Sequence, residues 1–254
     1  MIRVRLVILA LLSLPRVAHA FGEEGAFDPR VLITGAQTPP KSTGPARWAL
    51  ELSQRTSAPA RLQPSVVRAS DPKIVDGPFL YWSSREAAAP LTSTEIANLR
   101  RFFSLGGVLF IDDSGVNENG QPGPFAASSR REIARVLPET TPIALSPDHV
   151  LFRTFYLLRK PMGRVVSASP FEVIMRGGNV QVIFGSIDLA GALARTAMGG
   201  WESPLTPGGE MQREQAVRLA INIAMYVLCT NYKDDQVHAP FLMRRRTRLP
   251  FGMP

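Results

Sequence analysis

The segment 91–111 constrains the fold most, because it places an amphipathic helix almost directly before a buried strand. Thr92 and Glu95 have the spacing of a capping box, which marks the beginning of a helix over 91–107. A glycine pair closes that helix, and the four apolar residues 108–111 follow. Such a short apolar run is typical of a strand covered on both faces, so the segment predicts a sheet between two layers of helices.

The rest of the chain alternates strands and helices in the same way. Apolar runs bounded by turn residues predict strands, and apolar residues at helical spacing predict helices. We expect strands at 30–35, 64–70 and 78–82, helices at 45–56, 125–138, 188–195 and 208–233, and a β-hairpin within 171–188. This order predicts a three-layer α/β fold with a mainly parallel sheet, a late β-hairpin and a long C-terminal helix.

The first 20 residues have the layout of a secretory signal peptide. Two arginines precede an apolar stretch from Leu6 to Leu14, and the small-residue signal Ala18 to Ala20 comes directly before Phe21. The alternative is an uncleaved anchor, but the apolar stretch is short for a segment that crosses a bilayer. We therefore predict that 1–20 is a signal peptide and that the protein is exported to the periplasm.

Positive charge is concentrated at the two ends of the chain. The formal net charge is +8, but three arginines lie within 1–20 and four within 241–254, which leaves +1 over 21–240. Nucleic-acid-binding proteins usually carry a basic face spread over the fold, so we expect no nucleic-acid partner. We expect 241–254 to be a basic, flexible tail. The alternative is a weak contact with an anionic membrane through Arg244, Arg245, Arg246 and Arg248.

Cysteine and histidine are scarce in this chain. Cys229 is the only cysteine, which excludes an internal disulfide, and its apolar helical surroundings predict a buried, inert thiol. Beyond the signal segment the histidines are His149 and His238, too few for a zinc site of histidine and cysteine. The sequence also has no phosphate loop, dinucleotide fingerprint or metalloprotease helix, so we predict no cofactor.

Polar residues gather where predicted strands end. Asp112, Asp113 and Ser114 follow the central apolar strand, and Ser186 and Asp188 follow the second strand of the hairpin. The carboxyl ends of parallel strands are the usual ligand side of an α/β sheet, so these five are candidate ligand-binding residues. The three carboxylates could also hold Mg²⁺ or Ca²⁺. The other interpretation is structural, because aspartate and serine commonly start loops and cap helices.

Several segments, taken in order, resemble the family known as domain of unknown function 4159. They are "LYWSSREAAAPLTSTEIANLRRFFSLGGVLFIDD", "EIARVLPE", "SPDHVLFRTFY", "GSIDLAGAL", "RLAINIAMYVL" and "YKDDQVHAPFLMRRR". The resemblance covers roughly residues 28–246 and implies a flavodoxin-like fold, similar to that of class I glutamine amidotransferases, over 21–240. Family members occur beside genes for MoxR-type ATPases and von Willebrand A-type proteins, which implies an association with a cell-envelope system.

This chain departs from the amidotransferases at the position that carries their chemistry. In those enzymes the turn after the central strand holds a nucleophilic cysteine, whereas the corresponding turn here is Asp112-Asp113-Ser114-Gly115. Cys229 lies in the closing helix instead. The resemblance therefore implies the fold without the amidotransfer activity, which requires the thiol.

Two functions are consistent with these observations. The first is an exported, non-catalytic binding or scaffolding domain of the cell envelope, with a ligand at the strand ends and an envelope protein as a candidate partner. The alternative is a carboxylate- or metal-dependent hydrolase that uses Asp112, Asp113 and Asp188. That hydrolase requires at least two of the three carboxylates to converge within coordination distance.

Overall fold

The computed structural model describes residues 25–37 and 42–246, and the side chains of these residues up to Thr230. Seven strands form one sheet in the order β2-β1-β3-β4-β7-β6-β5. The neighbours from β2 to β7 are parallel, and the pairs β7/β6 and β6/β5 are antiparallel. The sheet is thus mainly parallel with a late hairpin, as the sequence predicts.

The elements follow the alternation of the sequence closely. The strands are β1 (Val31–Ile33), β2 (Val66–Arg68), β3 (Phe79–Ser84), β4 (Val108–Asp113), β5 (Ile143–Ala144), β6 (Glu172–Arg176) and β7 (Asn179–Gly185). The helices are α1 (Gly44–Arg55), α2 (Ser93–Ser104), α3 (Pro124–Val136), α4 (Leu189–Leu193), α5 (Glu210–Arg246) and the 3-10 turns η2 (Pro72–Asp76) and η3 (Val150–Phe152). The capping box at the start of α2 is present, because Thr92 and Glu95 exchange their hydrogen bonds there.

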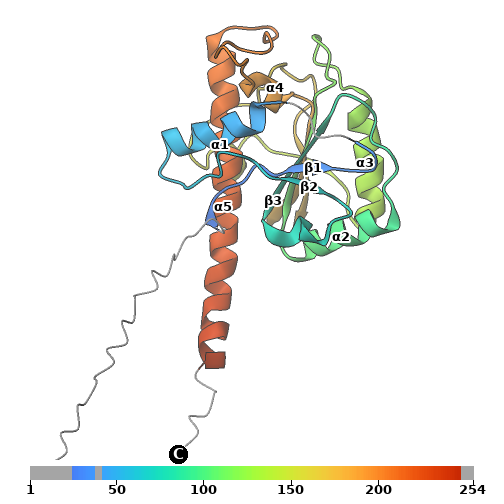
Figure 1. Ribbon diagram of the computed structural model, residues 1–254, viewed down its shortest axis with the longest axis vertical. Coiled ribbons are helices and arrows are strands. Elements are labelled where there is room, and N and C mark those ends of the chain that lie inside the picture. Colours follow the sequence, from blue (N-terminus) through green and yellow to red (C-terminus); the bar gives the residue numbers. More distant parts are fainter. Residues whose placement is uncertain (1–24, 38–41, 247–254) are drawn as a thin grey trace, which may run out of the picture.

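Helices cover both faces of the sheet (Figure 1), which confirms the three-layer α/β fold. Phe79 and Tyr81 of β3 pack in one core with α1, α4 and α5, whereas Leu80 and Trp82 pack in a second core with α2 and α3. Successive side chains of a strand point to opposite faces of the sheet, so the apolar run of β3 contributes side chains to both cores. The specific likeness to the amidotransferase fold stays a prediction.

The first core centres on Trp48 of α1, which is fully buried. Its indole Nε1 donates a 2.7 Å hydrogen bond to the carbonyl of Ala220 in α5, and its ring meets Tyr81 edge-on. The N–H of a buried indole usually has a hydrogen-bond partner, and the partner of Trp48 ties two helices together. α1 and α5 are thereby fixed against the same face of the sheet.

α5 differs from the prediction in two respects. Its backbone continues to Arg246, past the expected end at 233 and into the segment predicted as a flexible tail. Cys229 is exposed, so the prediction of a buried thiol is wrong. At 3.6 residues per turn, Cys229 lies on the opposite side of the helix from the buried Val227. Within the described part of the chain, no helix is both long and apolar enough to cross a membrane.

Candidate functional site

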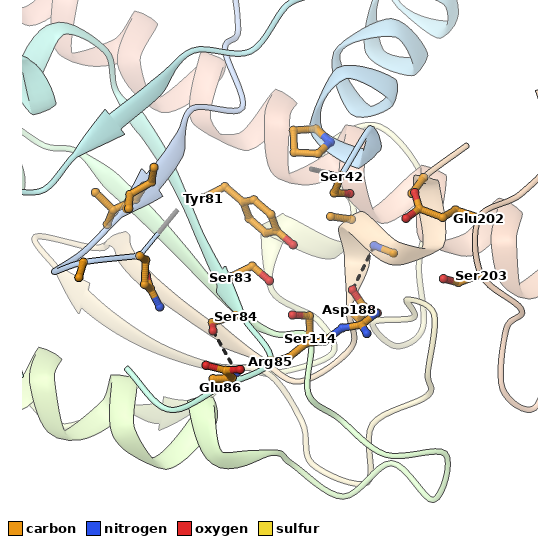
Figure 2. A pocket seen from close by; sticks show the side chains of 18 residues that line it. Ser42, Tyr81, Ser83, Ser84, Arg85, Glu86, Ser114, Asp188, Glu202 and Ser203 are labelled. Carbon is orange, nitrogen blue, oxygen red and sulfur yellow. Dashed lines mark hydrogen bonds between the residues drawn. The ribbon is translucent and has the colours of Figure 1, made fainter. Parts of the chain in front are cut away.

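A cavity of about 510 Å³ opens at the carboxyl ends of the parallel strands. Its walls come from the ends of β1 and β3, the starts of α1 and α4, and a loop before α5 (Figure 2). The lining residues are Leu32, Ile33, Ala36, Gln37, Ser42, Pro45, Tyr81, Ser83, Ser84, Arg85, Glu86, Ser114, Asp188, Ala190, Gly191, Ala194, Glu202 and Ser203. Its volume lies within the range of small-molecule sites in proteins.

The topology of the sheet accounts for this cavity. After β1 the chain enters α1 on one face, and after β3 it enters α2 on the other face. The two connections leave in opposite directions from neighbouring strands, so a crevice remains between their loops. In open α/β sheets ligands bind in such a crevice, outside the carboxyl ends of the strands.

Asp112, at the end of β4, is fully buried and does not line the cavity. It accepts hydrogen bonds from the Tyr81 hydroxyl at 2.8 Å and from three successive backbone N–H groups, those of residues 187–189, at 2.6 to 3.3 Å. Two carboxylate oxygens offer about four acceptor positions, so this set fills them. Asp112 therefore fixes the turn from β7 into α4.

Burial shifts the protonation of this pair of side chains. Removal from water raises the pKa of Asp112 to about 7, with a further contribution from the Asp188 carboxylate, whereas the hydrogen bonds from Tyr81, Leu189 and Ile187 act in the opposite direction. Burial, together with the charge of Asp112, raises the pKa of Tyr81 well above its ordinary value. The Tyr81 ring lines the cavity, so this coupled pair lies directly beneath it.

Asp113 closes the loop that follows β4. Its Oδ1 accepts from the N–H of Gly115 at 3.0 Å, and its Oδ2 accepts from the N–H of Gly123 at 2.5 Å. Burial raises the pKa of Asp113, and these backbone donors act in the opposite direction. The carboxylate thus joins the two ends of the loop, which is the turn-forming role expected for aspartate.

Asp188 begins α4 and faces the cavity. It has a left-handed backbone with φ of 51°, and its Oδ1 accepts from the N–H of Gly191 at 3.1 Å, which caps the helix. Its Oδ2 forms a buried ion pair with Arg164. Arg164 was not singled out by the sequence, because it lies in an irregular segment 24 residues before its partner.

The structure divides the five candidate residues into two groups. Ser114 and Asp188 line the cavity, whereas Asp112, Asp113 and Ser186 are buried behind it. In all three aspartates the carboxylate holds a turn or caps a helix, and Ser186 does not cap α4, since Asp188 does. Among the described residues, no group of three or more histidine, cysteine, aspartate or glutamate side chains could hold a metal ion.

Sequence reasoning missed most of the lining. Ser83, Ser84, Arg85 and Glu86 end or follow β3, at the same edge as Asp112, so the rule that selected Asp112 applies to them equally. The loop 194–209 does not follow a strand of the sheet, so its position in the sequence does not indicate a ligand site. Only its long-range contacts place it over the cavity.

Trp201 fixes that loop in place. The guanidinium groups of Arg195 and Arg213 stack on its ring, with their central carbons 3.6 and 3.9 Å from the ring centroid. Such cation–π contacts stabilise by roughly 0.5–2 kcal/mol each. Because Arg213 belongs to α5, the stack attaches the loop to the body and holds Glu202 and Ser203 at the cavity wall.

The histidine whose side chain is described, His149, lies away from this cavity. Its ring is 6.1 Å from that of Tyr226, whose hydroxyl accepts from the N–H of Val180 at the beginning of β7. Val180 lies at the amino end of that strand, the edge opposite to the cavity. Ser114 therefore has no described histidine beside it to act as a general base.

The chain matches a family model of protein domains. A family model described as "Domain of unknown function (DUF4159)" matches residues 31–228, which span β1 through most of the buried part of α5. No curated protein matches the chain.

Proposed function

The chain belongs to the DUF4159 family of domains of unknown function, and from that premise we propose that it is a non-catalytic binding domain that holds a small polar ligand. The ligand occupies the cavity between the ends of β1 and β3. The observation that carries this proposal is the open cavity of about 510 Å³ at the point where the connections of the sheet reverse direction.

The cavity has the chemistry of a site for polar molecules. Hydroxyl groups of Ser42, Ser83 and Ser114 lie around one open space in Figure 2, with the carboxylate of Glu202 at its far side. Leu32 and Ile33 supply an apolar floor. A few polar groups over an apolar surface are typical of sites that orient a small ligand.

The alternative function, a carboxylate- or metal-dependent hydrolase, gains less support from the site. A general base or metal ligand must offer a lone pair to the substrate or the ion. Asp112 has its acceptor positions filled by four hydrogen bonds, and Asp113 is buried, does not line the cavity and accepts two bonds from the backbone of its own loop. Asp188 faces the cavity but is paired with Arg164. The hydrogen bonds and the ion pair of these carboxylates therefore favour a structural role over a catalytic one.

The binding proposal is tested by capture of small molecules. Purified protein is incubated with a metabolite extract, separated by gel filtration and analysed by native mass spectrometry. We expect the wild type to carry a bound mass that Ala36→Trp lacks, because Ala36 is exposed at the cavity wall and a large ring there fills the space. Ala134→Trp, on the exposed side of α3, is the matched control. Equal capture by all three proteins, or by none, contradicts the proposal.

The location in the cell envelope is part of the same proposal and rests on residues 1–20, which lie outside the described residues. Export predicts that the protein recovered from the periplasm begins at Phe21, which N-terminal sequencing checks. Protein recovered only from the cytoplasm with its first 20 residues intact contradicts this proposal. An envelope protein as partner is likewise proposed, and cross-linking in intact cells followed by mass spectrometry tests it.

A further inference from the structure

A second cavity, of about 410 Å³, adjoins the first. Arg85, Ser114 and Ser203 line both cavities, so the two meet at these residues. The remaining walls of the second cavity are Gly115, Val116, Arg164 and Pro204. Its lining therefore contains two arginines and no carboxylate, which sets it apart from the first cavity.

Arg164 is held rigidly at this place. Its side chain is only 16% exposed, its Nε donates to the Asp188 carboxylate, and its Nη2 donates to the carbonyl of Val116 at 3.4 Å. The Nη1 group has no hydrogen-bond partner among the described residues. A guanidinium carries five N–H donors, so several donors of Arg164 are available to a ligand. Because the side chain is already fixed, binding does not cost the entropy of ordering it.

Arg85 supplies a second guanidinium that is still unused. It is exposed, lies beside Ser114 in Figure 2, and forms no hydrogen bond or ion pair with any other described residue. The hydroxyls of Ser114 and Ser203 also have no hydrogen-bond partner within the described part of the chain. Two cations and two hydroxyls thus border a single space, and two guanidinium forks suit a planar or tetrahedral oxyanion.

The charges of the two cavities are opposite in character. Arg85 lines both cavities, but the first is otherwise lined by the carboxylates of Glu86, Asp188 and Glu202, whereas only arginines carry charge in the second. We propose that Arg85 and Arg164 bind the oxyanion group, a carboxylate or a phosphate, of a small ligand whose hydroxyl or amino groups occupy the first cavity. This inference rests on the proposed function and adds the chemical class of the ligand.

The experiment measures anion binding by the full chain with isothermal titration calorimetry. Inorganic phosphate and succinate are titrated separately, with sodium chloride added to keep the ionic strength constant. The variants are Arg85→Ala, Arg164→Lys and the control Arg101→Ala, which removes an exposed arginine from α2. Arg164→Lys keeps a positive charge opposite Asp188 but loses the planar fork, so it tests geometry without an unpaired buried carboxylate.

We expect saturable binding of one of the two anions to the wild type, and the tighter anion identifies the group on the natural ligand. Arg85→Ala should weaken that affinity about tenfold, Arg164→Lys by a similar factor, and Arg101→Ala by less than about twofold. Equal affinities for Arg85→Ala and Arg101→Ala overturn the inference, and so does the absence of saturable binding of either anion. The capture experiment distinguishes this inference from the proposed function. If Ala36→Trp loses the bound small molecule and Arg85→Ala retains it, the anion inference is wrong and the proposed function is still supported.

Discussion

The buried Asp112 carboxyl connects the stability of this protein to pH. Its pKa is about 7 in the folded protein, against an ordinary value of 3.8 that applies when the chain unfolds. At pH values between 3.8 and about 7, the carboxyl is protonated in the folded state and ionised in the unfolded state. The protonated Asp112 therefore contributes to stability at low pH, and this contribution is lost as the pH rises through about 7. The free energy of unfolding should fall over this range by up to about 1.4 kcal/mol per pH unit.

Asp112→Asn provides the test of this dependence. Denaturant unfolding between about pH 5 and pH 8 should show a flatter pH profile for Asp112→Asn than for the wild type. The variant should also be less stable throughout, by about 1–3 kcal/mol, because the amide NH₂ replaces an acceptor of two hydrogen bonds. Burial lowers the pKa of His149, which affects both proteins equally and cancels in their difference. Parallel profiles for the two proteins contradict the assignment to Asp112.

At the scale of elements, α1 and α4 approach each other at a glycine. A Cβ placed on Gly44 would lie 2.3 Å from the carbonyl oxygen of Ala190 and 2.7 Å from its Cα, which are backbone atoms that cannot rotate away. Gly44→Ala should therefore lower the free energy of unfolding by about 1–3 kcal/mol. Gly200→Ala, which meets only the Thr196 hydroxyl at an ordinary 3.5 Å, is the control and should change it by less than about 1 kcal/mol. Similar values for the two variants contradict the close approach.

α5 also holds an irregular segment against the body through a single side chain. Asn222 is fully buried, accepts from the N–H groups of Phe155 and Tyr156, and donates to the carbonyl of Tyr156. Asn222→Ala leaves these backbone groups without partners, so we expect a loss of about 2–4 kcal/mol in thermal or denaturant unfolding. Cys229→Ala, at an exposed position of the same helix, should stay within about 0.5 kcal/mol of the wild type. A neutral Asn222→Ala contradicts the role of this amide in holding the segment.

The sequence predicts most elements because their signals are local. The capping box of Thr92 and Glu95 and the apolar run of β4 are each complete within a few residues, and both are confirmed. The short strand β5 escaped prediction, because its two residues, Ile143 and Ala144, become a strand only through pairing with β6. The sequence predicts an end of α5 at 233, whereas its backbone continues through Pro240 to Arg246.

For the whole molecule, the site was harder to predict than the fold. The aspartates were placed correctly at the strand ends, yet their long-range hydrogen bonds decide that Asp112 lies behind the cavity and not in its wall. Arg164 and Ser203 come from irregular segments about 40 residues apart, and only the folded chain brings them to one space with Arg85. The hydrophobic periodicity of the sequence does not predict that these three residues lie together.

α5 gives the whole molecule its length, because its backbone runs along one face of the sheet and continues past the body in Figure 1. Arg244, Arg245 and Arg246 lie in its last turn, although their side chains and Arg248 are outside the described residues. We propose a weak contact of this end with anionic lipid. At low salt the full chain should co-sediment with anionic vesicles more than a chain ending at Pro240, at roughly 1 kcal/mol per basic residue. Equal sedimentation contradicts the contact.

The stack of Trp201 between Arg195 and Arg213 has a practical consequence. Trp48 and Trp82 are fully buried, whereas Trp201 is half-buried on the loop that carries Glu202 and Ser203. A ligand that enters the cavity should therefore alter the fluorescence of Trp201 and leave the other two indoles unchanged. A titration followed by tryptophan emission should show a saturable change that is lost in Trp201→Phe, and a change retained by that variant contradicts this origin. The contact that fixes the loop thus supplies a built-in optical probe of an occupied site.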